Sequence, residues 1–89
     1  MFFSVGIETP KDANTAYGIV VPALFRNDMA CLSAADTQDE IGAMTREAIL
    51  LTVELLVEQG VSVSDIHDAG VFVYRADPQW ADSDTWLLV

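Results

Sequence analysis

Carboxylates are the most numerous groups in this sequence that are able to do chemistry. Of its 89 residues, 14 are Asp or Glu. Asp39 with Glu40, and Asp82 with Asp84, stand close enough for acid–base catalysis or metal binding. The first pair lies in a helix-capping pattern that begins at Thr37, which already explains its residue types. The second lies in a polar loop and is interpreted as solvated surface. We therefore expect neither pair to be catalytic, and we expect no metal ion and no cofactor.

The remaining reactive groups do not form an active-site pattern. The residue types of a hydrolase triad occur together in Ser62, Ser64, Asp65 and His67. Closeness in sequence does not give triad geometry, however, and no Gly-x-Ser-x-Gly motif is present. Cys31 is the single cysteine, so no internal disulfide and no thiolate metal cluster can form. It lies in an apolar segment and is interpreted as a small core residue. The sequence therefore predicts a protein that is not an enzyme.

The charge balance excludes several classes of partner. Fourteen acids and four bases give a formal net charge of −10 at pH 7. The bases are Lys11, Arg26, Arg46 and Arg75. They are too few to neutralise phosphates, so no binding to nucleic acid or to an anionic membrane is expected. A basic protein partner is favoured, because opposite charges speed encounter. No apolar run approaches the roughly 18 residues of a membrane span. The first residues lack a signal-peptide pattern, which predicts a cytoplasmic protein.

Three short strands are predicted in the first third of the chain. Apolar residues alternate with polar or small ones at Phe3, Val5 and Ile7, which is the period of a half-buried strand. Residues 16–21 and 29–34 are rich in apolar and β-branched side chains, which favours two further strands. The connections between the three are short. This order therefore predicts an antiparallel meander.

A long helix is predicted after the third strand. Thr37 and Glu40 have the spacing of a capping box, in which each side chain accepts a hydrogen bond from the backbone amide of the other. Asp36 adds negative charge at the positive end of the helix dipole. The helix is predicted over residues 38–59, with Gly60 at its end. One long helix packed on a meander gives an α+β fold.

This helix has more apolar residues than one buried face needs. One arc of roughly 80° is expected to cover the sheet. It holds Ile41, Met44, Ala48, Leu51 and Leu55. A second arc is acidic and holds Glu47, Glu54 and Glu58, with Leu50 and Val57 beside it. Two interpretations stay open. Either the helix is deeply embedded or carries scattered exposed apolar residues, or its second side contacts another protein chain.

The last third of the chain is less regular. Residues 61–70 are predicted to form a polar connection, and residues 71–74 fit a strand or a helical turn equally. Trp80 lies in an acidic loop and is expected to be exposed, as interface tryptophans are. Residues 85–89 predict a buried fourth strand. The simplest connection makes this strand parallel to a central strand through a right-handed crossover.

Four short motifs follow one another in a characteristic order. They are Val21-Pro22-Ala23-Leu24, Cys31-Leu32-Ser33, Asp36-Thr37-Gln38-Asp39-Glu40 and Glu47-Ala48-Ile49. In this order and spacing, residues 1–60 resemble HicB-type antitoxins, and residues 77–89 are similar to the tail of one longer subgroup. The resemblance implies a partial RNase H-like fold. In that fold a helix crosses three antiparallel strands and a fourth strand lies beside the first.

The resemblance also implies a function. HicB-type antitoxins bind and inhibit a small basic HicA-type toxin, an mRNA-cleaving ribonuclease. The full-length proteins commonly carry a C-terminal DNA-binding segment and form homo-oligomers. Residues 1–89 would then be a single N-terminal domain, with the DNA-binding segment absent from them. Docking of this acidic domain on the RNA-binding surface of the toxin is the mechanism that we expect.

A contact face and two alternative functions complete the sequence-based predictions. The candidate partner-binding residues are Glu47, Leu50, Glu54, Val57, Glu58 and Trp80. One alternative is a small RNase H-like nuclease that uses Mg²⁺, which needs carboxylates such as Glu8 and Asp36 to converge. The other is a generic dimerisation or ligand-sensing module.

Overall fold

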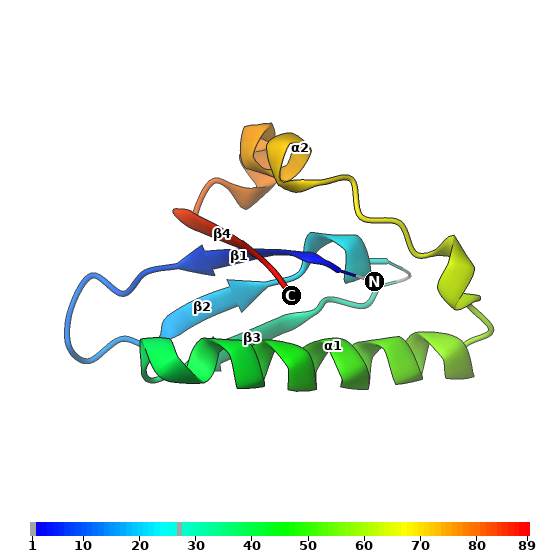
Figure 1. Ribbon diagram of the computed structural model, residues 1–89, viewed down its shortest axis with the longest axis horizontal. Coiled ribbons are helices and arrows are strands. Elements are labelled where there is room, and N and C mark those ends of the chain that lie inside the picture. Colours follow the sequence, from blue (N-terminus) through cyan, green and yellow to red (C-terminus); the bar gives the residue numbers. More distant parts are fainter. Residues whose placement is uncertain (1, 27) are drawn as a thin grey trace.

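The computed structural model describes residues 2–26 and 28–89. In this part of the chain the strands and α-helices follow one another as β1, β2, β3, α1, α2 and β4 (Figure 1). They span Ser4–Glu8 (β1), Tyr17–Val20 (β2), Leu32–Ala35 (β3), Ile41–Glu58 (α1), Val71–Ala76 (α2) and Thr85–Leu88 (β4). Short 3₁₀ turns lie at Pro22–Leu24 (η1), Gln38–Glu40 (η2), Val63–Asp65 (η3) and Pro78–Trp80 (η4). The predicted α+β fold is confirmed.

The strands form one antiparallel sheet in the order β3-β2-β1-β4. The first three make the predicted meander, with Ile7 opposite Ile19 and Ile19 opposite Ser33. The fourth strand lies beside the first, as the resemblance implied, with Gly6 opposite Trp86. α1 lies along one face of this sheet (Figure 1).

The predicted direction of β4 was wrong, because β4 runs antiparallel to β1. After α1 the chain does not cross directly into the sheet. Residues 61–76 first run back along the length of the molecule, and β4 begins only after η4 (Figure 1). This additional pass reverses the direction of the last strand. β4 is also an edge strand instead of a buried one, with Leu87 38% and Leu88 64% exposed.

The third strand begins later than predicted. Residues 29–34 were expected to form it, but β3 begins at Leu32. Met29 instead closes a tight turn with Arg26, in which each backbone amide donates to the carbonyl of the other. Pairing with the second strand begins at Cys31, whose carbonyl accepts from the Val21 amide at 3.1 Å. The turn therefore uses the residues that the pattern had assigned to the strand.

The predicted helix is present, but its first turn is capped differently. η2 and α1 together cover residues 38–58, and Gly60 follows with a φ of 92°, a conformation that favours glycine. The Thr37 hydroxyl donates to the Glu40 carboxylate at 2.9 Å, and the Glu40 amide donates to the Thr37 carbonyl at 3.2 Å. The backbone bond of the 3₁₀ turn thus replaces the predicted bond from amide to hydroxyl. Asp36 precedes this turn and is exposed.

The side of α1 that faces the sheet is not the predicted one. Its buried residues are Ile41, Thr45, Thr52 and Leu56. Leu51 and Leu55, expected to face the sheet, are 58% and 41% exposed. At 100° per residue, the buried side is rotated by roughly 70° from the predicted arc. The prediction was wrong because it treated threonine as polar. The Thr45 hydroxyl donates to the Ile41 carbonyl at 2.6 Å, so it can be buried without an unpaired donor.

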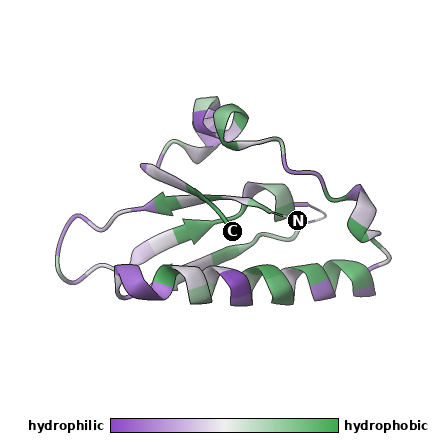
Figure 2. Cartoon of the chain, viewed as in Figure 1, coloured by the Kyte–Doolittle hydropathy of each residue, from purple (hydrophilic) through white to green (hydrophobic). Residues whose placement is uncertain are grey.

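The hydrophobic core lies between α1 and the sheet. Its buried residues are Phe3, Val5, Ile7, Ile19, Val21, Leu24, Cys31, Ala35, Ile41, Leu56 and Ile66. Val5 and Ile7 of β1 and Ile19 of β2 belong to this set, and Tyr17 of β2 is partly buried against it, as the alternation in the sequence predicted. Figure 2 shows the same pattern as hydrophobic colour on β1, β2 and β3, and along α1 among its hydrophilic residues.

Asp68 ties the returning chain to the opposite face of the sheet. Its carboxylate accepts from the amide and the hydroxyl of Ser4, at 2.8 and 2.6 Å, and from the amide of Gly70 at 3.0 Å. Ser4 is fully buried. Gly70 has a φ of 98°, which favours glycine, and α2 begins at the next residue. The undecided residues 71–74 are therefore helical.

The segment after Asp68 covers only part of this outer face. Tyr74 of α2 stacks on Trp86 of β4, with ring centroids 6.2 Å apart. Ser83 packs so closely on β1 that a Cβ at Gly6 would overlap it. These contacts lie over β1 and β4. On the outer side of β2 and β3, residues 79–83 contribute side chains to a groove that stays open to solvent.

Replacing Asp68 by alanine removes the acceptor for the amide and the hydroxyl of Ser4. Because Ser4 is fully buried, water does not replace this acceptor. We expect Asp68→Ala to lower the free energy of unfolding by about 1–3 kcal/mol, measured by urea denaturation. Asp82→Ala, at an exposed carboxylate, is the control and should change it by less than about 0.5 kcal/mol. Equal effects of the two substitutions would show that the Asp68 bonds are not stabilising.

Candidate functional site

Cys31 occupies a position that disfavours nucleophilic chemistry. Its side chain is 1% exposed and lies in the core beneath α1. Burial raises the pKa of this thiol, and a hydrogen bond with Thr52 only partly opposes the shift. Since the thiolate is the reactive form, a raised pKa makes Cys31 less reactive. The interpretation as a core residue is confirmed.

The residues of triad type lie around η3 without triad geometry. The Ser62 and Ser64 hydroxyls bond to each other at 2.8 Å, and both side chains are exposed. Asp65 and His67 are exposed as well, and buried Ile66 separates them in the chain. Neither serine is bonded to the histidine in the part of the chain that the structure describes. This cluster therefore has no activated nucleophile.

One carboxylate of each close pair, Glu40 or Asp84, serves local structure. Glu40 binds the Thr37 hydroxyl, as described above. Asp84 accepts from the hydroxyl and the amide of Thr9, at 2.7 and 3.0 Å, and from the Thr85 hydroxyl at 2.9 Å. The Thr9 hydroxyl is the main reason that the pKa of Asp84 lies below its ordinary value. Asp84 is therefore ionised near neutral pH, which does not suit a general acid.

The carboxylates that a nuclease would need are on different strands. Glu8 ends β1 and Asp36 directly follows β3, with β2 between them. Neighbouring strands are ~4.8 Å apart, so the two backbones are separated by roughly 10 Å. Both side chains are exposed. Among residues 2–26 and 28–89, no group of three His, Cys, Asp or Glu side chains is placed to hold a metal ion. The nuclease alternative therefore has no site in this region.

Five of the six candidate contact residues lie on the solvent side of α1. Glu47, Glu54 and Glu58 are exposed, and Leu50 and Val57 are 62% and 49% exposed. This side carries carboxylates and large apolar side chains together. It has the composition of a protein-binding surface, in which apolar contacts supply affinity and charges set specificity.

Trp80 does not join the other five. It belongs to η4 and packs edge-on against Phe25, with ring centroids 4.8 Å apart and an interplanar angle of 82°. Its side chain is half-buried, although the sequence analysis expected it to be exposed. The sheet lies between Trp80 and the solvent side of α1. A single partner reaches both only by passing around the edge of the sheet.

An apolar groove that no pattern in the sequence indicated lies between α1 and β3. This helix groove has a volume of about 300 Å³. Its lining includes Met29, Leu32, Met44, Glu47, Leu51 and Leu55. Leu51 and Leu55 are available to it because the buried side of α1 is rotated away from them. No signal in the sequence distinguished them from buried residues.

A second groove lies on the other side of β3. This tryptophan groove has a volume of about 310 Å³. Its lining includes Glu8, Gly18, Val20, Leu32, Trp80 and Asp82. Leu32 lines both grooves and is 60% exposed. The alternation at the start of β3, where Cys31 just before the strand is buried and Leu32 is exposed, is the sequence signal that could have shown Leu32 on this outer surface.

The described residues thus form an α+β domain whose long helix carries both carboxylates and exposed apolar side chains on its solvent side. In this part of the chain no helix combines the length and the apolar character needed to span a membrane. A family model described as the HicB-like antitoxin of bacterial toxin–antitoxin systems matches residues 3–89. The chain belongs to this family, which confirms the resemblance found in the sequence.

Two solved structures share the fold. The N-terminal domain of the Burkholderia pseudomallei antitoxin HicB matches with a TM-score of 0.72 and 32% identity, covering 100% of this chain and 95% of that one. The antitoxin HicB of the same organism matches with the same TM-score and identity, but this chain covers only 61% of it. A comparison with curated proteins gives no match.

The burial of Cys31 predicts slow alkylation of the folded protein. At pH 8 we expect iodoacetamide to modify the native thiol more than about tenfold more slowly than the thiol in 8 M urea, because only the accessible thiolate reacts. Mass spectrometry of timed samples measures both rates. The unfolded chain is its own control, since it holds the same single cysteine. A native rate equal to or above the unfolded one would contradict the structural role.

Proposed function

We propose that this chain is the toxin-neutralising domain of an antitoxin that binds and inhibits a HicA-type, mRNA-cleaving ribonuclease toxin. Family membership supports the role of antitoxin. The observation that carries the more specific proposal is the solvent side of α1, where three carboxylates stand among exposed apolar residues. This combination suits a basic protein surface that otherwise binds RNA.

The mechanism is occlusion. An acidic domain that docks on the RNA-binding surface of a toxin competes with the phosphates of the RNA for the same basic groups. Glu47, Glu54 and Glu58 are the proposed charged contacts, and Leu50 and Val57 are the apolar contacts beside them. The charges speed encounter and fix orientation, while burial of the apolar side chains provides most of the affinity. Trp80 is a further contact if the partner extends around the sheet edge to the tryptophan groove.

This function sets the expected location and assembly. A toxin that cleaves mRNA acts in the cytoplasm, so we propose that its antitoxin acts there as well. We also propose that the full-length antitoxin is a homo-oligomer, as the resemblance of the sequence implies. Nothing in the described residues favours the nuclease alternative.

Reversing the charges on α1 tests the proposed contact face. We expect the combined variant Glu47→Lys, Glu54→Lys and Glu58→Lys to bind the proposed HicA-type partner toxin at least about tenfold more weakly, mainly through a slower association rate. The unmodified chain should bind faster at 50 mM than at 500 mM salt, because salt screens the attraction. Biolayer interferometry at several salt concentrations measures both effects.

A matched variant separates the contact face from net charge alone. Asp12→Lys, Asp39→Lys and Asp65→Lys change three exposed carboxylates that do not lie on the solvent side of α1. Each substitution adds two charges, so both triple variants go from −10 to −4. We expect the control to retain most of the affinity. Equal losses in the two variants would mean that only net charge matters and would reject this face.

A further inference from the structure

The outer edge of β3 is open for pairing with another strand. The Val21 amide donates to the Cys31 carbonyl at 3.1 Å, so these residues form a hydrogen-bonded pair of the β2–β3 ladder. In an antiparallel ladder such pairs alternate with pairs whose backbone groups point away from the partner strand. The amides and carbonyls of Leu32 and Ala34 therefore point away from β2. They lie at the edge of the sheet, because β3 is its last strand.

This edge lacks most of the features that usually block pairing, although β3 is a short strand of four residues. Proteins protect edge strands with charged side chains, proline or a covering loop. The sequence of β3 is Leu-Ser-Ala-Ala, with neither charge nor proline. Leu32 and Ala34 are exposed. A strand placed beside β3 would meet little steric resistance from side chains of β3.

The grooves on the two sides of β3 fit the side chains of such a strand. Successive side chains of a strand point to opposite faces of the sheet. Those on one face would enter the helix groove, against Leu51 and Leu55. Those on the other face would enter the tryptophan groove, against Trp80. Backbone bonds with alternate side chains in pockets are how proteins recognise an added strand.

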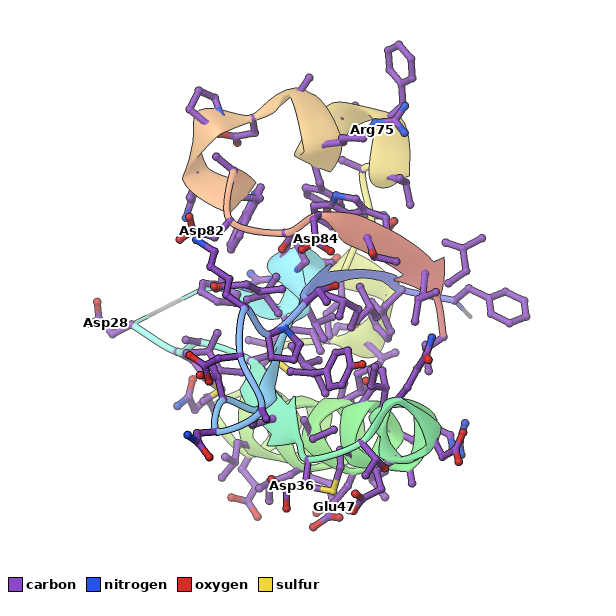
Figure 3. All side chains as sticks on the ribbon, turned by 90° about the vertical axis from the view of Figure 1, so that its left-hand side faces the viewer. Asp28, Asp36, Glu47, Arg75, Asp82 and Asp84 are labelled. Atoms are coloured by element: carbon purple, nitrogen blue, oxygen red, sulfur yellow. The ribbon has the colours of Figure 1, made fainter. Side chains whose placement is uncertain are left out.

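Charge distinguishes the β3 edge from the β4 edge. The charged residues that line the two grooves beside β3 are the acids Glu8, Glu47 and Asp82. The groove beside the end of β4 is lined by Arg46 instead. Figure 3 shows Asp36 and Glu47 together at the α1 end of the molecule and Arg75 at the opposite end, on α2. A second copy of this acidic chain would be repelled at the β3 edge, whereas a basic chain would be attracted.

We propose that the β3 edge binds an extended, basic strand of the partner protein, which becomes a fifth strand of the sheet. This inference rests on the proposed function, in which the partner is the toxin, and specifies how that partner is held. It also explains how one partner contacts α1 and Trp80 together, because the added strand lies between them.

Hydrogen exchange of the unmodified, ¹⁵N-labelled chain tests this pairing. The Leu32 and Ala34 amides are expected to exchange quickly in the free protein. On addition of the proposed HicA-type partner toxin, we expect their exchange to slow by more than about tenfold, because each amide gains a partner. Leu88 provides the matched control. The backbone amides of Phe3 and Val89 each donate to the carbonyl of the other, so these residues form a hydrogen-bonded pair. The neighbouring Leu88 amide therefore points away from β1, at the other edge of the sheet. Its exchange should not change.

A pair of proline variants tests whether the edge contributes to affinity. Ala34→Pro removes the outward amide of β3 without removing a bond to β2, and Leu88→Pro makes the same change on β4. We expect Ala34→Pro to weaken toxin binding by more than about tenfold and Leu88→Pro by less than about twofold. Ala34→Thr keeps the amide and should bind as the unmodified chain does. Thermal melting checks that each variant is folded, and the exchange experiment decides the question if Ala34→Pro does not fold.

The outcomes separate this inference from the proposed function. A complex that forms without slowing Leu32 and Ala34 overturns the inference and leaves the proposed function intact. The absence of any complex overturns the proposed function, and the inference with it. Slow exchange that depends on the concentration of this chain alone shows a second copy at the edge, which overturns the inference. Slowing at Leu88 instead places the partner at β4 and also overturns it.

Discussion

The hydrogen bonds from Ser4 to Asp68 determine which part of the outer face of the sheet is covered. They join residues 64 positions apart and fix the returning chain over the middle of the sheet. From that point α2 and η4 can reach the outer side of β1 and β4, and the last strand enters antiparallel to β1. Residues 69–89 form α2, η4 and β4, and none of them pairs with β3. The open side of β3 therefore follows from where the returning chain is anchored.

The orientation of α1 also leaves apolar surface uncovered beside β3. Its core-facing side includes two threonines, so part of its leucine content remains outside. Leu51 and Leu55 lie toward β3, and Leu50 lies toward Phe3 and Val89. A helix that buried every leucine would present much less apolar surface to solvent. This helix instead keeps apolar side chains on both flanks of an acidic strip. Such a surface is stable in water because of its charges and still gains free energy when a partner covers it.

The features that could be predicted from the sequence were local ones. The limits of the helix were predicted closely because the capping residues and Gly60 act within a few residues of the helix ends. The first two strands follow from alternation alone. The direction of β4 could not be predicted, since it depends on the distant contact between Ser4 and Asp68. The buried side of α1 was misjudged because a threonine hydroxyl can bond to its own helix. The partial burial of Trp80 depends on Phe25, 55 positions earlier in the chain.

The large negative charge gives the open edge its selectivity. An unprotected edge strand ordinarily promotes pairing between identical chains. Here identical chains each carry a charge of −10, and carboxylates line both grooves beside the edge. Pairing of two copies through β3 would bring these carboxylates together, which costs free energy. A basic strand meets attraction at the same place. The negative charge thus lets the β3 edge remain open to a basic strand while disfavouring a second copy of this chain. Blocking residues such as proline would exclude both.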